Sequence, residues 1–182
     1  YLHLAPDPDQ TRDLMASGVV GIAYETVTSS HGGLPLLKPM SQVAGRMSIQ
    51  AGASALEKAH GGRGVLLGGV PGVAPGKVCV IGGGVVGFNA AQMAAGLGAD
   101  VTILDRDPEV LERLDNHFEG RAKTRFSNRA VVQQMVCESE LVIGAVLILA
   151  PRLSRGLNAL ALGEAQAAHM GIEVQRLKRL TI

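Results

Sequence analysis

The chain contains no tryptophan and only two cysteines, its aromatic content is 3%, and its formal net charge is +1. The near-neutral charge gives no electrostatic reason to expect a nucleic acid or an anionic membrane as a partner. Cys79 and Cys137 have neither metal-ligand spacing nor the pattern of a disulfide framework, so we expect no metal and two reduced thiols in a cytoplasmic protein. With 47% hydrophobic residues and so few aromatics, the core must be largely aliphatic, which suits parallel strands buried between helices.

Charge is also missing from a long internal segment. Residues 78–99 contain no Asp, Glu, Lys or Arg, and a segment of that length is long enough to span a membrane. Its many glycines, together with Asn89 and Gln92, favour a closely packed unit within a folded domain instead. We therefore expect no association with a membrane.

The same segment begins the most informative pattern in the chain. An apolar run of β type, 78–81, leads into the sequence Gly82-Gly83-Gly84-Val85-Val86-Gly87. A helical stretch follows, and a second apolar run, 101–104, ends on Asp105. This order of strand, glycine turn, helix, strand and acid is the arrangement that a dinucleotide-binding site requires. The alternative is a glycine turn with a purely structural role, and the complete context favours the binding site.

Each glycine in the pattern has a physical role. Gly82 permits a tight turn, Gly84 lets backbone N–H groups approach a diphosphate, and Gly87 allows the helix to lie close to its strand. The diphosphate would lie at the helix N-terminus, beside Val85 and Val86, where unpaired N–H groups and the helix dipole favour an anion.

The acid that ends the pattern selects the cofactor. Asp105 lies at the tip of the second strand, where a carboxylate can accept hydrogen bonds from the ribose hydroxyls of the adenosine. Because the same carboxylate would repel a 2′-phosphate, the sequence predicts NAD rather than NADP as the cofactor.

Strands and helices continue to alternate after Asp105. We expect helices at 108–117 and 129–138 and strands at 123–126 and 141–145. This alternation predicts an α/β fold with a parallel, right-handed, doubly wound sheet of the Rossmann type. Only four strands can be counted, so we expect the sheet to be incomplete.

The segments before the glycine turn are less regular. We expect the end of a strand at 1–5, a helix at 10–17 and a buried strand at 19–28. Ser41 has the side chain of a good N-cap, and a helix rich in small residues is expected from there to about residue 58. Residues 61–72 contain too much glycine for a regular element and predict a tightly packed loop.

These segments carry a second pattern, which can be compared with known families. The segments are Tyr1-Leu-His-Leu-Ala, Ile22-Ala-Tyr-Glu-Thr-Val27, Leu34-Pro-Leu-Leu-Lys-Pro-Met-Ser-Gln-Val-Ala-Gly-Arg46, 61–73 and 80–105. In this order they resemble alanine dehydrogenase, within the family that also contains the nicotinamide-binding part of pyridine nucleotide transhydrogenase. The likeness covers residues 1–148, and the blocks at 24–27 and 61–72 are more similar to the dehydrogenase than to the transhydrogenase.

The resemblance implies an activity and roles for three residues. The activity is the reversible oxidative deamination of L-alanine to pyruvate and ammonia, with hydride transfer to NAD, in a homohexamer. His3 would be the general acid/base beside the substrate carbonyl, a role that suits an imidazole because proton transfer must accompany hydride transfer. On the residues alone, a histidine flanked by leucines is more often structural. Ser41 would contact the cofactor, and Ser127, after the third strand, would lie near the adenine.

The resemblance also implies a division of the chain. Residues 1–58 correspond to part of the catalytic, substrate-binding domain and a connecting helix, residues 59–148 to the NAD(H)-binding Rossmann domain, and residues 149–182 to a tail that departs from the family pattern. The substrate-binding arginine and lysine of the family would precede Tyr1, and no aspartate follows Asp115.

These departures lead us to expect a fragment. Its tail, irregular or helical, would come from a frameshift or an incomplete gene model. Such a chain is expected to bind NAD weakly or not at all and not to turn over alanine by itself. Two alternatives stay open, a transhydrogenase α-type subunit and an NAD-binding module without catalysis. Nucleic-acid binding by the basic tail is disfavoured, because the tail lacks aromatic platforms.

Overall fold

The computed structural model describes residues 1–2, 4 and 7–144. His3 and the predicted tail, 149–182, lie outside the described residues. The chain divides into two compact units, Tyr1–Gln42 and Val43–Ile182, which we call unit 1 and unit 2. The candidate site lies in unit 2.

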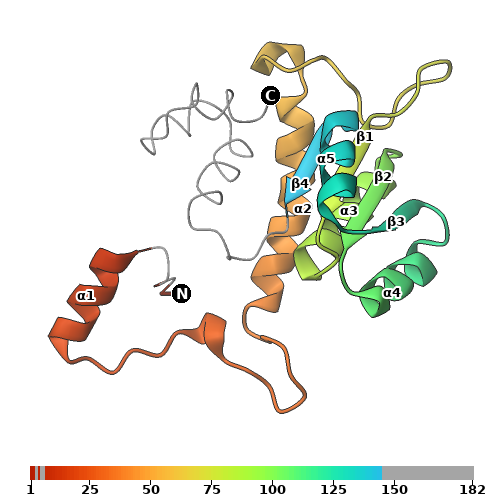
Figure 1. Ribbon diagram of the computed structural model, residues 1–182. Helices are drawn as coiled ribbons and strands as arrows, with labels where there is room; N and C mark the ends of the chain where they lie inside the picture. The colour runs from red at the N-terminus through yellow and green to blue at the C-terminus, as the bar shows by residue number, and fades with distance from the viewer. Residues whose placement is uncertain (3, 5–6, 145–182) are drawn as a thin grey trace. The chain divides into compact units, whose positions relative to one another are not determined.

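Unit 2 is built on one parallel sheet (Figure 1). Its four strands are β1 (Lys77–Ile81), β2 (Asp100–Asp105), β3 (Ala122–Phe126) and β4 (Leu141–Gly144). They pair in the order β3-β2-β1-β4, so the chain runs outward from β1 to β3 and then crosses back to the other side of β1. This order confirms the predicted doubly wound α/β fold with an incomplete sheet.

Three helices connect these strands at the predicted places. They are α3 (Val85–Gly96), α4 (Pro108–Phe118) and α5 (Arg129–Glu138). The side chains of Asp107 and Asn128 cap the N-termini of α4 and α5, and Pro108 occupies the first turn of α4. These local signals explain why the bounds predicted for both helices agree with the observed bounds to within one residue. The uncharged segment 78–99 is divided between β1 and α3, and none of the helices in the described part of the chain is long and apolar enough to cross a membrane.

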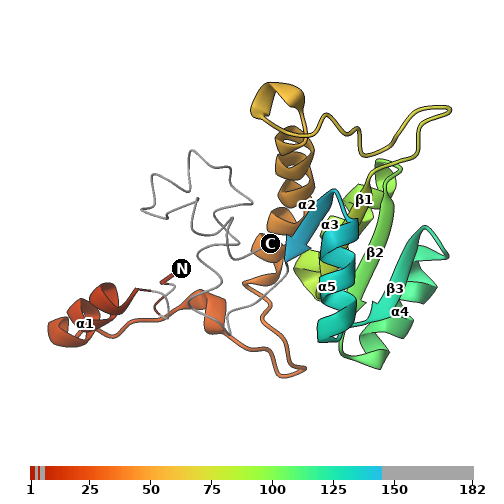
Figure 2. The ribbon, with the colours of Figure 1, turned by 45° about the horizontal axis from the view of Figure 1, so that its top comes forward.

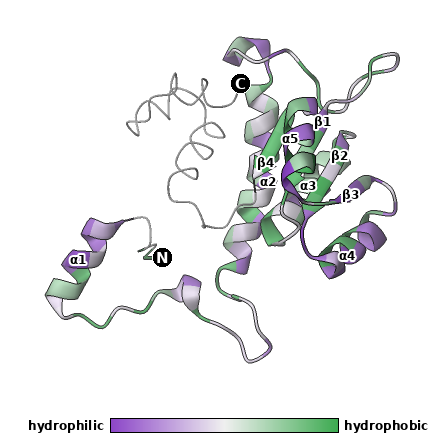
Figure 3. Ribbon diagram, viewed as in Figure 1, coloured by the Kyte–Doolittle hydropathy of each residue, from purple (hydrophilic) through white to green (hydrophobic). Residues whose placement is uncertain are grey.

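Helices cover both faces of the sheet (Figures 1 and 2). Alternate strand residues belong to different core clusters on these two faces. Val80 and Ile103 pack with residues of α2, α3 and α4, whereas Cys79 and Leu104 pack with Met135 of α5. The hydropathy colouring shows apolar residues concentrated in the sheet (Figure 3). The aliphatic core predicted from the composition is therefore present.

The two cysteines lie in different surroundings. Cys79 is fully buried in β1, and burial raises the pKa of its thiol to about 11. Cys137 is exposed on α5. Neither forms a disulfide in the described residues.

Helix α2 (Lys38–Ala55) runs across the boundary between the units. Its buried residues, Gly45, Ile49 and Gly52, recur at helical spacing, and a Cβ on Gly52 would come within 2.6 Å of the Leu141 side chain in β4. The C-terminal part of α2 therefore packs against the sheet layer of unit 2.

The prediction that Ser41 caps α2 is wrong. The helix begins at Lys38, with Pro39 in its first turn, and the Ser41 N–H donates to the Leu37 carbonyl at 3.1 Å. Proline is favoured at the start of a helix because its missing N–H is not needed there. That signal outweighs the serine three residues into the helix.

Unit 1 contains the predicted helix but not the predicted strand. Helix α1 (Pro8–Ser17) is capped by Asp7 and ends at Gly18. The strand predicted at 19–28 is replaced by irregular chain with a 3₁₀ turn at Tyr24–Thr26, and the described residues of 1–5 form no strand either. A strand needs a partner for its backbone groups, and no described strand pairs with 19–28, so apolar side chains such as Val20 stay exposed.

The glycine-rich loop before β1 has the predicted character. Residues 61–72 contain no helix or extended strand, apart from a single bridge between Val70 and Val73 at the end of the loop. A Cβ on Gly62 or Gly68 would lie 2.3 or 2.4 Å from a backbone carbonyl oxygen, of Ala55 or Leu97 respectively. Glycine is therefore required at both positions for the loop to pack closely.

Candidate dinucleotide-binding site

Three predicted positions meet at the carboxyl edge of the sheet. Gly82 follows β1, Asp105 ends β2 and Ser127 follows β3. The Gly82 N–H donates to the Leu104 carbonyl and the Ser127 N–H to the Asp105 carbonyl, each at 2.7 Å. In an open α/β sheet, ligands bind at this edge where the strand order reverses, which here is between β1 and β4.

The glycine turn has the tight geometry that the sequence predicts. Gly82 has a φ of 98°, a backbone conformation that residues with a side chain rarely adopt. A Cβ on Gly87 would lie 1.8 Å from the Gly82 carbonyl oxygen, so only glycine lets α3 start this close to β1. Gly83, to which the sequence assigned no role, is constrained less severely, because its Cβ would come within 2.5 Å of the Leu114 side chain in α4, which can move more easily than a backbone atom.

The N-terminus of α3 differs from those of α4 and α5. Gly84 occupies its N-cap position, and no side chain accepts a hydrogen bond from the first turn. A Cβ on Gly84 would meet no protein atom within 4 Å. The N–H groups of Val85 and Val86 therefore begin a helix with no side-chain cap and with open space at its cap residue. This is the local geometry that receives a phosphate group.

Asp105 is held by the turn that it faces. Its Oδ2 accepts a hydrogen bond from the Gly83 N–H at 2.6 Å, and its Oδ1 accepts one from the Asp107 N–H at 2.9 Å. Burial opposes ionisation of the carboxyl, but hydrogen bonds from the backbone of Asp107, Gly83 and Arg106 and the charge of Arg106 outweigh it. The pKa of Asp105 is therefore lower than its ordinary value, and the group is a carboxylate at neutral pH.

One cationic residue near the turn has no signal in the sequence. Arg113, on α4, donates to the Gly83 carbonyl at 3.4 Å. No sequence motif links a residue at this position to the glycine turn. Arg113 reaches the turn only because α4 packs beside it. Arg106 adds a second positive charge, close enough to Asp105 to lower the pKa of its carboxyl.

Two predicted residues are not placed with the turn. Ser41 is half-buried in unit 1, whereas the glycine turn belongs to unit 2. His3 lies outside the described residues.

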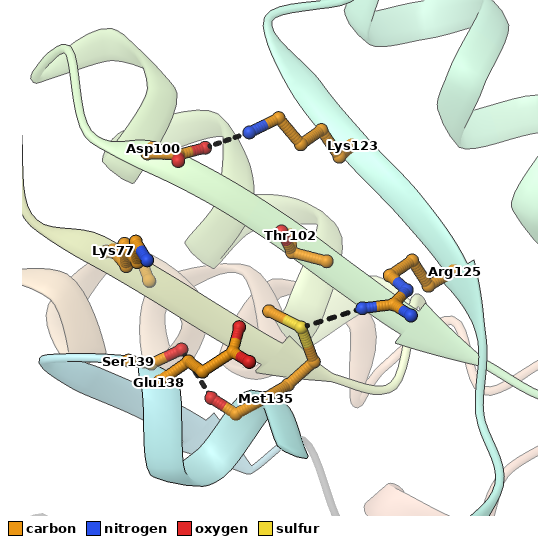
Figure 4. Close-up of a pocket in the computed structure, with 9 residues that line it drawn as sticks. Lys77, Asp100, Thr102, Lys123, Arg125, Met135, Glu138 and Ser139 are labelled. Atoms are coloured by element: carbon orange, nitrogen blue, oxygen red, sulfur yellow. Dashed lines mark hydrogen bonds and ion pairs between the residues drawn. The ribbon is translucent and has the colours of Figure 1, made fainter. Parts of the chain in front are cut away.

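A cleft at the other end of the strands has a different character (Figure 4). Lys77 and Asp100 begin β1 and β2, and Lys123 forms an ion pair with Asp100 at 2.7 Å. Thr102 of β2 and Arg125 of β3 also line the cleft. Met135 and Glu138 of α5 line it from the other side, together with Ser139, which follows the helix. This cleft lies away from the glycine turn, and the ion pair between Asp100 and Lys123 is typical of a solvated sheet face.

The fold and this turn together place unit 2 in the class of Rossmann-type α/β domains. Two family models match the chain, "Alanine dehydrogenase/PNT, C-terminal domain" over residues 48–157 and "Alanine dehydrogenase/PNT, N-terminal domain" over residues 1–44. The chain belongs to the alanine dehydrogenase/PNT family. The resemblance stated from the sequence is thus confirmed, and the first match extends past its predicted end at Ile148.

Individual relatives agree with this assignment. The chain is 60% identical over 156 residues to the alanine dehydrogenase of Halomonas elongata, covering 84% of this chain and 42% of the relative. It is 58% identical over 148 residues to that of Geobacillus stearothermophilus, covering 81% and 40%. A solved structure of L-alanine dehydrogenase matches with a TM-score of 0.74 and 54% identity, covering 82% of this chain and 42% of the other. The chain therefore spans about two fifths of the length of these relatives.

Proposed function

We propose that unit 2 is the NAD-binding unit of an alanine dehydrogenase. The complete enzyme would convert L-alanine, water and NAD⁺ into pyruvate, ammonium, NADH and a proton. The observation that carries the proposal is the uncapped N-terminus of α3 beside an ionised Asp105, at the edge of the sheet where dinucleotides bind. The names and identities of the relatives support the choice of reaction.

The described residues fit the cofactor. The N–H groups of Val85 and Val86 would bind the diphosphate, and Gly84 would leave room for it. Asp105 would accept hydrogen bonds from the ribose hydroxyls, because its two oxygens together have about four acceptor positions, more than the three backbone N–H groups that they bind. Ser127 would contact the adenine side. Bound NAD would supply the acceptor for the hydride.

Two further roles rest on the family resemblance. His3 would exchange a proton with the substrate as hydride is transferred, because imidazole titrates close to neutral pH. Ser41 would contact the cofactor. A cytoplasmic homohexamer, with alanine, pyruvate and ammonia as substrates and products, completes the proposal for the whole enzyme.

Of the two outcomes expected from the sequence, weak binding or none, we propose that the 182-residue chain binds the dinucleotide weakly, and that it does not turn over alanine, since it spans 40–42% of the relatives' length. Incubating the purified chain with alanine and NAD⁺ and following NADH absorbance tests this directly. We expect no alanine-dependent NADH, and sustained production would overturn the proposal that the chain is inactive alone.

Cofactor choice tests the proposed binding site. NADH and NADPH are titrated into the chain, into Asp105→Asn and into Asp100→Asn, which makes the same chemical change at the opposite end of β2. We expect the chain to prefer NADH, Asp105→Asn to lose about tenfold or more in NADH affinity and most of the preference, and Asp100→Asn to keep both. Equal affinity of the unaltered chain for the two cofactors would contradict the proposal.

A further inference from the structure

Helix α2 reaches the start of α3 through one arginine. The Arg46 side chain donates from Nε to Asn89 Oδ1 and from Nη2 to Gln92 Oε1, each at 3.1 Å. The two acceptors lie three residues apart on one face of α3, where the planar guanidinium fork can contact both. Among the described residues, Arg46 forms no ion pair. Its contacts with α3 are therefore hydrogen bonds to neutral amides.

Asn89 carries this contact to the first residue of α3. Its side chain is buried, with 3% of the residue exposed, and its Nδ2 donates to the Val85 carbonyl at 2.8 Å. Arg46 is the partner of its Oδ1. A buried amide with both ends bonded has one preferred orientation, so Arg46 fixes the group that holds the Val85 peptide.

The backbone of α2 reinforces the same contact. A Cβ on Gly45 would lie 2.2 Å from the Val86 carbonyl oxygen and 2.9 Å from Asn89 Cβ, so α2 presses directly on the first turn of α3. That turn has no side-chain cap of its own. Its orientation is therefore set by what packs against it.

We propose that Arg46 is a positioning residue for the dinucleotide, acting through Asn89 to hold the first turn of α3 in the orientation that binds a diphosphate. The role rests on the proposed function, since it concerns the same turn. Through this contact, α2 would affect the affinity for the cofactor directly. The boundary between the two units also falls within α2.

The test compares arginine variants by their affinity for ADP-ribose, the diphosphate-containing part of the cofactor. Arg46→Met removes the donors and keeps the aliphatic stem, and Arg46→Lys keeps the charge without the fork. Arg63→Met is the matched control, because Arg63 lies in the glycine-rich loop and its ion pair is with Glu140. Titrations followed by NMR detect weak binding and report on Val85 and Val86 directly, and unfolding curves establish that each variant is folded.

We expect Arg46→Met to lower the ADP-ribose affinity about tenfold and Arg46→Lys to restore part of it, with Arg63→Met unchanged. The amide resonances of Val85 and Val86 should shift in unliganded Arg46→Met but not in Arg63→Met. If the unaltered chain binds ADP-ribose and folded Arg46→Met binds it equally well, the positioning role is wrong and the proposed function stands. If ADP-ribose leaves the Val85 and Val86 resonances of the unaltered chain unchanged, the proposed function fails and this role with it.

Discussion

Single glycines determine whether the turn between β1 and α3 can form. Gly87 lies in a helix and has no unusual dihedral angle, yet its Cβ would overlap the Gly82 carbonyl oxygen. The sequence pattern predicted this approach, because the third glycine of the fingerprint serves helix–strand contact. It did not predict the role of Gly83, since the contact with Leu114 depends on where α4 packs.

Replacing Gly87 with alanine tests this contact. We expect Gly87→Ala to lower the free energy of unfolding by about 1 to 3 kcal/mol or more, because a backbone oxygen cannot rotate away from the new methyl group. Gly96→Ala is the control in the same helix, where a Cβ would meet nothing within 4 Å. It should be neutral or add up to about 1 kcal/mol. Urea unfolding measures the free energy of unfolding of both variants. If Gly87→Ala is as stable as Gly96→Ala, the close approach of Gly87 to the Gly82 carbonyl oxygen is refuted.

Asp105 links the glycine turn to the charge state of the site. Its lowered pKa means that the folded state favours the carboxylate, so its contribution to stability is present above the unfolded pKa of about 3.9. As the pH falls through the lower folded pKa, that contribution is lost.

The difference between the unaltered chain and Asp105→Asn should therefore depend on pH. At pH 7 we expect the variant to be about 1 to 3 kcal/mol less stable, because the charge-assisted bonds to Gly83 and Asp107 are weakened. The gap should narrow below about pH 4. Unfolding free energies measured between pH 3 and pH 7 check this, and a gap that does not change with pH would argue against an ionised Asp105.

At the scale of elements, local signals explain what the sequence predicted. The glycine turn, the proline and Asp107 at the start of α4 and Asn128 before α5 each act within a few residues, and the helices they mark were located closely. The segment 19–28 has strand composition, but a strand forms only with a partner, which composition does not reveal. Ser41 shows a competition between two local signals, in which Pro39 determined the start of the helix.

The same limit applies to the site. Gly82, Gly84, Gly87 and Asp105 could be selected from spacing because they belong to one strand–turn–helix–strand pattern, whereas Ser127 was selected from the family resemblance. Arg46 and Arg113 could not be assigned to the turn in this way, since helix packing alone brings them to α3 and to Gly83. The cofactor contacts of the glycines, Asp105 and Ser127 stay predictions, as do the roles of His3 and Ser41.

The packing of α2 gives a prediction at this scale. Ile49 is fully buried in the same core cluster as Val80 and Ile103, whereas Met47, two residues earlier, is 58% exposed. Ile49→Ala should cost about 2 to 5 kcal/mol of unfolding free energy, and Met47→Ala less than about 0.5. Chemical denaturation distinguishes them. Equal, small losses would mean that α2 does not belong to the core of unit 2.

At the scale of the whole molecule, the chain matches both family models, one over all of unit 1 and the other within unit 2. It nevertheless spans only about two fifths of the length of its relatives. Unit 2 contains the complete glycine turn, the acid that ends β2 and the core that supports them. Weak binding of the dinucleotide is therefore the part of the proposed function that this chain is expected to retain.

The most direct test of that claim is to map amide resonances of the 182-residue chain during titration with NADH. The account predicts saturable shifts centred on Gly83, Gly84, Val85 and Val86 and on the end of β2 at Asp105, with the cleft beside Lys77 and Lys123 unaffected. Shifts centred on that cleft, or no change at the glycine turn at millimolar NADH, would contradict it.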